Sequence, residues 1–224
     1  MKTLRHFSLL LAAAGLFLSS CSGLNRTQKG AVIGASGGGA IGGVIGRATG
    51  NTAMGVIIGA TVGGVAGAVI GRKMDQQAEE MKRVLGDAEV RREGEGIVIE
   101  FREKVLFAFD RSDLNASAKA NLDKLANVLK KYPDTNIEIL GHTDDKGSDD
   151  YNQSLSQRRA TEASAYLRNV GISAARVTTR GMGESDPKAS NETEAGRADN
   201  RRVEFVITAN QKMVEEAKRE SGSR

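Results

Sequence analysis

The sequence IEILGHTDDKGSDDYNQSLSQRRATEASAYLRNVG, residues 137–171, sets the architecture expected for this chain. Its first part, Ile137 to Leu140, is rich in apolar and β-branched residues and predicts a strand that leads into Gly141-His142-Thr143-Asp144. A helix is predicted from about Asn152 to Val170, because apolar residues recur there at helical spacing and Gly171 is a typical helix terminator. A strand, a polar loop and a long helix therefore form the centre of the predicted domain.

Arg159 is the anomaly of this helix, because it falls inside the apolar stripe whereas Arg158 points away from it. A guanidinium on a core-facing stripe needs a partner, since an unpaired buried charge is costly. Two interpretations stay open. Arg159 could form an internal salt bridge, to Asp110 or Asp144, or it could hold the carboxylate of a ligand.

Similar elements are predicted on both sides of this centre. Apolar residues at helical spacing predict a helix that ends at Tyr132-Pro133: Ala118, Leu122, Leu125, Ala126 and Leu129. Short apolar runs predict four further strands: 97–102, 105–109, 177–182 and 203–208. This alternation predicts an α/β fold, an α+β sandwich with helices on one face of a sheet, and residues 96–210 suffice for one independent core.

The N-terminus has the layout of a secretory signal peptide. Lys2 and Arg5 form a basic region, and an apolar run from Phe7 to Leu18 follows that is too short to span a membrane. The segment Leu18-Ser19-Ser20-Cys21 resembles the bacterial lipobox. The resemblance implies that residues 1–20 are removed, that Cys21 is lipidated and that the mature chain starts with a lipidated segment, 21–29. Several acyl chains at one point give stable membrane attachment where one chain does not.

Residues 30–71 contain 15 of the 27 glycines, most of them in two ladders with a period of four. The ladders consist of Gly34, Gly38, Gly42, Gly46 and Gly50, then Gly55, Gly59, Gly63, Gly67 and Gly71. This period places the glycines of a ladder on one face of a helix, and such faces let two helices approach closely in membranes. The block resembles a glycine-zipper segment and predicts a helical hairpin, for which membrane association is favoured over a soluble hairpin.

Charged residues dominate the chain after the glycine block. Residues 72–95 carry many charges and a few apolar residues at helical spacing, which predicts a solvated surface helix that serves as a spacer. Residues 211–224 are a polar tail, for which we expect a short helix that frays into disorder.

Composition excludes several classes of function. The net charge of +4 includes Lys2 and Arg5, and without them 30 Lys and Arg residues stand against 28 Asp and Glu. Because these charges are interleaved, nucleic acid is not expected as a partner. Cys21 is the single cysteine, which excludes an intrachain disulfide and a multi-cysteine zinc site.

Catalysis and metal binding have little support in the sequence. Once the signal peptide is removed, His142 is the only histidine, and no nucleophile accompanies it. The acidic loop from Asp144 to Asp150 does not fit a calcium loop, because Lys146 and Ser148 occupy ligand positions and Leu155 stands at the twelfth. We expect no catalytic residue, no metal and no cofactor.

A long series of residues closely resembles the OmpA-like peptidoglycan-binding domain. The series begins at Gly141-His142-Thr143-Asp144 and continues through Tyr151-Asn152, Arg159-Ala160, Gly181-Met182-Gly183-Glu184 and Asn200-Arg201-Arg202-Val203-Glu204. The resemblance implies a βαβαβ-β domain over 96–210, and its ordered identities are far more specific than one short motif.

The same resemblance implies a ligand, namely the diaminopimelate of the peptidoglycan stem peptide. In this family, the positions of Asp144 and Arg159 hold the ammonium and the carboxylate at the free end of that residue. The other matching pocket positions are Asp110, Thr143, Asn152 and Arg202. The acidic loop after Asp144 departs from the family pattern, so it could alter affinity or favour an amidated or different diamino acid.

Two hypotheses about function follow. The first is an outer-membrane lipoprotein, anchored by its lipid and facing the periplasm, that binds peptidoglycan non-covalently and tethers membrane to wall. The second is a membrane-associated assembly or pore protein in which the glycine hairpin forms homo-oligomers and the C-terminal domain anchors it. Both can hold at once.

Overall fold

The structure is a computed structural model that describes residues 52–107 and 111–222. The predicted signal peptide, Cys21, the first glycine ladder and Asp110 lie outside the described residues.

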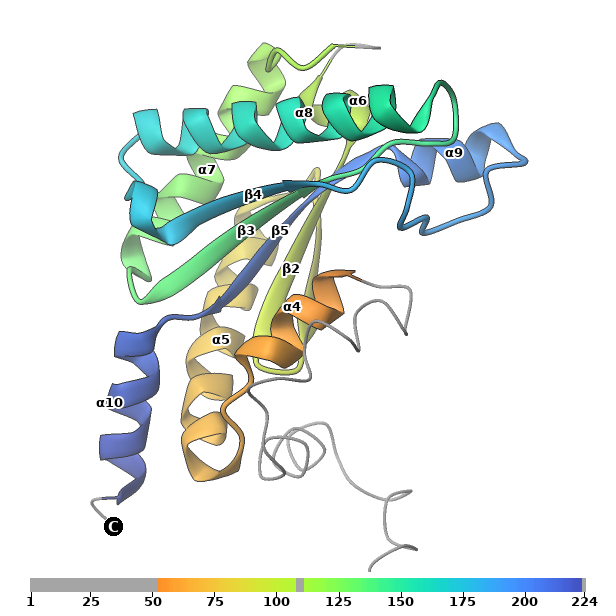
Figure 1. The fold of residues 1–224 in the computed structure, drawn as a ribbon. Helices are drawn as coiled ribbons and strands as arrows, with labels where there is room; N and C mark the ends of the chain where they lie inside the picture. The colour runs from red at the N-terminus through yellow and green to blue at the C-terminus, as the bar shows by residue number, and fades with distance from the viewer. Residues whose placement is uncertain (1–51, 108–110, 223–224) are drawn as a thin grey trace, which may run out of the picture.

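Within the described residues, one sheet has the strand order β1-β2-β5-β3-β4, with β3 and β4 parallel and all other neighbours antiparallel (Figure 1). The strands are β1 Glu89–Glu93, β2 Gly96–Arg102, β3 Thr135–Gly141, β4 Val177–Gly181 and β5 Arg202–Ala209. The helices are α4 Thr52–Ala60, α5 Gly64–Val84, α6 Glu103–Leu106, α7 Ala116–Lys131, α8 Asp149–Asn169, the short 3-10 helix η2 Ala174–Arg176, α9 Glu194–Asn200 and α10 Gln211–Gly222. The predicted α/β fold class is confirmed.

The main core lies between one face of the sheet and helices α5, α7 and α8. Phe101 of β2 and Phe205 of β5 meet there edge to face, with ring centroids 5.8 Å apart, and Leu122 and Leu125 of α7 are fully buried. Helix α7 begins where the side chain of Asn115 accepts a hydrogen bond from the backbone of Ala118. The predicted helices at α7 and α8 and the predicted strands at β2, β3, β4 and β5 are confirmed, with small shifts at their ends.

Helix α4 covers the opposite face of the sheet, so the expectation that all helices lie on one face is wrong (Figure 1). Ile57 of α4 is buried in a second apolar cluster with Val98, Leu140 and Val206, which come from three strands. The N–H of Thr52 donates to the carboxylate of Asp186 at 3.0 Å and fixes the start of α4. The helix that carries Gly55 and Gly59, two of the five glycines of the second ladder, thus packs on the domain that follows it.

The second ladder is not one continuous helix, because the chain breaks between α4 and α5. Gly63 and Gly64 adopt φ angles of 68° and 64°, which glycine reaches without steric cost. No helix in the part of the chain that the structure describes combines the length and the apolarity that crossing a membrane requires.

Residues 72–95 were expected to form a solvated spacer, but most of them belong to the folded domain. Met74, Ala78 and Met81 of α5 are fully buried in the main core, and β1 pairs with β2. On α5 the charged residues lie on the outer face and the apolar stripe packs in the core, while the other charges of this segment lie on and around β1. Helix α5 and strand β1 are therefore parts of the sheet-and-helix domain.

Two other expectations need correction. The strand predicted at 105–109 is wrong, because the chain forms the single helical turn α6 and then an isolated bridge between Phe107 and Leu114. A short apolar run does not distinguish a strand from a buried helical turn. The tail does not fray throughout its length: α10 extends to Gly222 and packs on α5, with Met213 and Ala217 buried.

Candidate functional site

A cleft opens where the C-terminal end of β3 meets the start of α8, the turn α6 and the end of α9. Its lining residues are Glu103, Thr143, Asp144, Lys146, Tyr151, Asn152, Leu155, Arg159, Glu194, Arg197 and Arg201. The cleft has a volume of about 210 Å³, below the roughly 300–1,000 Å³ of sites that bury a drug-sized ligand. The end of a strand is a common place for such a site, because the chain leaves the sheet there.

Arg159 lies on the buried side of α8, as its position in the apolar stripe predicts, and its side chain is 2% exposed. Its Nη2 forms an ion pair with Oε1 of Glu103, and its Nε donates to the carbonyl of Arg111 at 3.0 Å. Its guanidinium carbon also lies 5.4 Å from the ring centre of Phe107, a cation–π distance. Among the described residues, the salt-bridge partner of Arg159 is therefore Glu103 and not Asp144. Asp110, the other partner that the sequence suggested, lies outside the described residues.

Asp144 pairs with Arg201. Its Oδ2 accepts from Nη1 of Arg201 at 2.5 Å, and its Oδ1 accepts from the backbone N–H of Lys146 at 3.1 Å. Nε of Arg201 lies 2.9 Å from Oε2 of Glu103, and its Nη2 lies 2.8 Å from Oε1 of Glu194. A continuous series of opposite charges thus joins Asp144, Arg201, Glu103 and Arg159. We call these four residues the charge network.

The charge network affects the protonation of Arg201. Burial alone would lower the pKa of this guanidinium, but hydrogen bonds with Glu194 and Asp144 and the charges of Asp144 and Glu103 raise it above its ordinary value. Arg201 therefore stays cationic throughout the range in which the protein functions.

Thr143 and Asn152 complete the cleft beside Asp144. Nδ2 of Asn152 donates to the carbonyl of Asp144 at 3.3 Å and to Oε2 of Glu184 at 2.6 Å, which holds the loop against α8. The hydroxyl of Thr143 is buried and has no hydrogen-bond partner among the described residues. A buried hydroxyl without a partner at the wall of a cleft is a candidate for contact with a ligand.

The structure brings four of the predicted ligand-binding residues into the cleft, but Arg202 is not among them. Arg202 starts β5 and pairs with Glu204 at 2.8 Å on the sheet face that α4 covers. Arg201 caps the C-terminal end of α9 and its side chain reaches the cleft, whereas Arg202, the first residue of β5, points to the face that α4 covers. The expectation that Arg202 lines the pocket is wrong.

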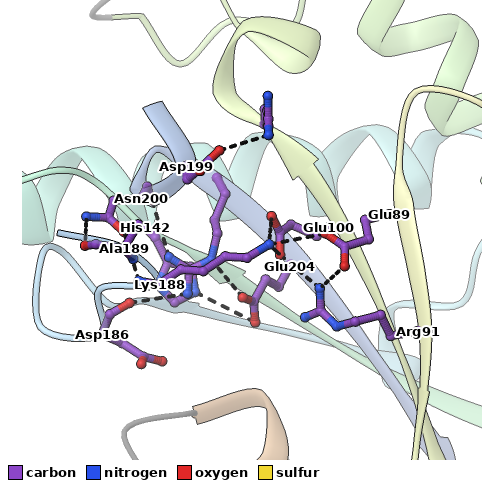
Figure 2. Close-up of polar contacts among 12 residues, drawn as sticks. Glu89, Arg91, Glu100, His142, Asp186, Lys188, Ala189, Asp199, Asn200 and Glu204 are labelled. Carbon is purple, nitrogen blue, oxygen red and sulfur yellow. Dashed lines mark hydrogen bonds and ion pairs between the residues drawn. The ribbon is translucent and has the colours of Figure 1, made fainter. Parts of the chain in front are cut away.

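Arg202 and Glu204 belong to a separate polar region, in which Figure 2 labels Glu100, His142, Lys188 and Glu204. In it, Lys188 pairs with Glu100 at 2.8 Å, and His142 lies 4.0 Å from Glu204. Both ring nitrogens of His142 are buried and lack hydrogen-bond partners within the described ranges. Burial and the charge of Arg202 place the pKa of His142 well below its usual value, so the ring is neutral.

Sequence reasoning missed Glu103, Glu194 and Arg201. Arg201 was present in the matched series Asn200-Arg201-Arg202, so the signal existed, but the strand register was needed to choose between the two arginines. Glu103 falls at the junction of β2 and α6, which was predicted as the gap between two strands. Nothing in its local pattern distinguishes it from a solvated glutamate.

Comparisons with known proteins fit this architecture. The sequence profile of the OmpA family matches residues 106–201, and that of a YMGG-like Gly-zipper matches residues 1–75. Outer-membrane lipoprotein YfiB of Pseudomonas aeruginosa is 40% identical over 115 residues, which cover 51% of this chain and 68% of that protein. The chain belongs to the OmpA family.

Other similar proteins match only part of this chain. Outer membrane porin F of Pseudomonas fluorescens is 46% identical over 112 residues, which are 50% of this chain but only 34% of the porin. Among solved structures, the cell wall anchor of the T6SS from Pseudomonas aeruginosa is 28% identical with a TM-score of 0.54, over 61% of this chain and 97% of that one. The shared part is the sheet-and-helix domain that carries the cleft.

Proposed function

We propose that this protein is an outer-membrane lipoprotein that binds peptidoglycan non-covalently through the diaminopimelate of the stem peptide. In this proposal, lipid on Cys21 fixes the chain to the membrane and the cleft faces the periplasm, so that the protein tethers membrane to wall. Similarity to an outer-membrane lipoprotein and to a cell wall anchor supports this location and role.

The observation that carries the proposal is the placement of Asp144 and Arg159 in one cleft, joined by Arg201 and Glu103. The free end of diaminopimelate bears an ammonium and a carboxylate on the same carbon. A carboxylate and a guanidinium that face one small volume can bind both groups at once through charge-assisted hydrogen bonds. Asp144 would take the ammonium and Arg159 the carboxylate.

The polar residues beside Asp144 support the same assignment. The hydroxyl of Thr143 can donate or accept a hydrogen bond at the wall of the cleft. Asn152 holds the Asp144 loop against α8 through its hydrogen bonds to the Asp144 carbonyl and to Glu184, and thereby keeps the carboxylate in place. Binding is then a matter of two opposite charges and a few neutral hydrogen bonds, without a chemical step.

The packing of α4 favours the tether over the alternative of a membrane assembly driven by the glycine zipper. Helix α4, which carries two of the five glycines of the second ladder, packs on the sheet through Ile57, and the ladder is broken at Gly63. An oligomer that used this ladder as one helix would first have to detach α4 and expose its apolar cluster to water.

Co-sedimentation with purified sacculi tests the proposal. The full-length protein in mild detergent is the correct sample, because a fragment that starts at residue 95 would lack α5 and β1. We expect wild type to co-sediment, free meso-diaminopimelate to compete, and Asp144→Asn to lose binding at least about tenfold, the effect of one lost charge-assisted bond. The matched control is Arg180→Gln, since Arg180 pairs with Glu138 on the surface of the sheet at 2.8 Å. Equal binding by wild type and Asp144→Asn would contradict the proposal.

A further inference from the structure

Glu103 is the buried residue that joins both arginines of the cleft. Its Oε1 pairs with Arg159 and its Oε2 lies 2.9 Å from Nε of Arg201. It is 7% exposed and begins the single turn α6, so neighbouring backbone fixes its position directly after β2. The backbone N–H of Glu103 also donates to the carbonyl of Arg201 at 2.7 Å. Glu103 and Arg201 are therefore joined by a backbone hydrogen bond as well as by the ion pair of their side chains.

Within the charge network, Glu103 and Asp144 stand against Arg159 and Arg201, and the exposed Glu194 pairs with Arg201 from the mouth of the cleft. The sequence pointed to Asp144 and Asp110 as the acids here, and Asp110 lies outside the described residues. If Glu103 were absent, Asp144 would be the one buried carboxylate among the described residues beside the two guanidiniums, and the cleft would attract anions of suitable size more strongly. With Glu103 present, a ligand that brings a carboxylate alone must compete with Glu103 for the guanidiniums. Such a ligand has no ammonium for Asp144, which would stay paired with Arg201 and add nothing to the binding.

We propose that Glu103 makes the cleft selective for zwitterions, that is, for ligands with an ammonium and a carboxylate on one carbon, over ligands with carboxylates alone. This inference rests on the proposed function and adds the element that sets its specificity. A zwitterion adds no net charge to the cleft, while it provides new partners for both Asp144 and Arg159. Glu103 acts through the arginines as a positioning residue.

The test compares two probes of the same carbon length on the full-length protein. These are meso-diaminopimelate and pimelate, which is the same dicarboxylate without the two ammonium groups. Titration calorimetry of wild type should show binding of meso-diaminopimelate and much weaker binding of pimelate. Glu103→Gln keeps the shape of the side chain but removes its charge, so pimelate should bind this variant more tightly than it binds wild type. The affinity for meso-diaminopimelate divided by the affinity for pimelate should fall by about tenfold or more. Glu103→Asp keeps the charge and should retain most of the selectivity.

The outcomes separate this inference from the proposed function. Failure of wild type to bind meso-diaminopimelate or sacculi would overturn the proposed function, whereas normal binding with an unchanged ratio in Glu103→Gln would overturn only the role of Glu103. If Glu103→Gln does not fold, Arg201→Gln provides the second test, because it leaves Glu103 and Arg159 paired and makes the network negative. It should raise the affinity for 1,5-diaminopentane, a dication, relative to meso-diaminopimelate. An unchanged ratio there would also overturn the inference.

Discussion

Glu95 lies against Gly67 so closely that a β-carbon added at Gly67 would stand 2.3 Å from Oε1 of Glu95. The same carboxylate accepts hydrogen bonds from the backbone N–H groups of Val62 at 2.7 Å and Gly63 at 2.9 Å. It therefore satisfies the backbone where the chain breaks between α4 and α5. The small surface of this glycine serves a contact inside the domain, in addition to any role in the membrane.

Replacement of Gly67 by Ala should destabilise the protein by about 1–3 kcal/mol, because Glu95 must move and leave the backbone N–H groups of Val62 and Gly63, the second of them buried, without their acceptor. The matched control is Gly71→Ala in the same ladder and helix, where the nearest neighbouring atom to an added β-carbon is Nη2 of Arg92 at 3.9 Å. That control should be neutral or more stable by up to about 1 kcal/mol, from helix propensity. Urea unfolding gives the free energy of unfolding of both variants. Equal changes in Gly67→Ala and Gly71→Ala would contradict the role assigned to Glu95.

Arg159→Met should cost about 3–5 kcal/mol of stability, because Glu103 stays buried with one of its two cations removed. The double variant Arg159→Met with Glu103→Gln should recover a large part of this loss, since the uncompensated charge is gone. Chemical unfolding of the two single variants and the double variant gives the coupling energy. Arg180→Met, at an exposed ion pair with Glu138, should change stability by less than about 1 kcal/mol. Additive effects of the two cleft substitutions would refute a direct Glu103–Arg159 interaction.

Gln77 of α5 is fully buried, and neither atom of its side-chain amide has a hydrogen-bond partner among the residues described. Gln77→Met keeps a similar volume and removes two desolvated polar groups, so it should stabilise the fold by about 1–3 kcal/mol. The adjacent Gln76 is exposed, and Gln76→Met should have almost no effect. Thermal unfolding of both variants checks this, and a loss of stability in Gln77→Met would show that the amide has a partner.

His142 should make the protein less stable in mild acid. Burial, helped by the charge of Arg202, lowers the pKa of its imidazole well below the usual 6.5. As the pH falls through 6.5, the unfolded chain takes up a proton that the folded ring does not, so the free energy of unfolding falls by up to about 1.4 kcal/mol per pH unit. Burial raises the pKa of Glu204, and this carboxyl acts in the opposite direction as the pH falls toward 4.5.

A comparison of wild type with His142→Gln isolates the histidine, because Glu204 is present in both. Urea unfolding at pH 7 and pH 5 should show a larger loss for wild type than for the variant. Parallel losses in the two proteins would mean that His142 does not titrate in this window.

The hydrophobic pattern of the chain was enough to identify α7, α8 and the strands β2 to β5. Periodicity records which face of an element is buried, and for this reason it also identified Arg159 as a buried cation. The resemblance to the OmpA family added Asp144, Thr143 and Asn152 and located them in one site. Asp110 and Cys21 lie outside the described residues and stay predictions.

The pattern could not say which surfaces meet, because contacts between residues far apart depend on the order and register of the strands. Glu103 reaches Arg159 across 56 positions of sequence, and no local signal predicts that pair. Arg201 and Arg202 are neighbours in the sequence, but Arg201 lies in the cleft and Arg202 lies on the opposite face of the sheet. In the same way, the glycine spacing indicated a helix surface that another group can approach closely. Only the fold shows that Glu95 contacts Gly67 and that α4 packs on the sheet through Ile57.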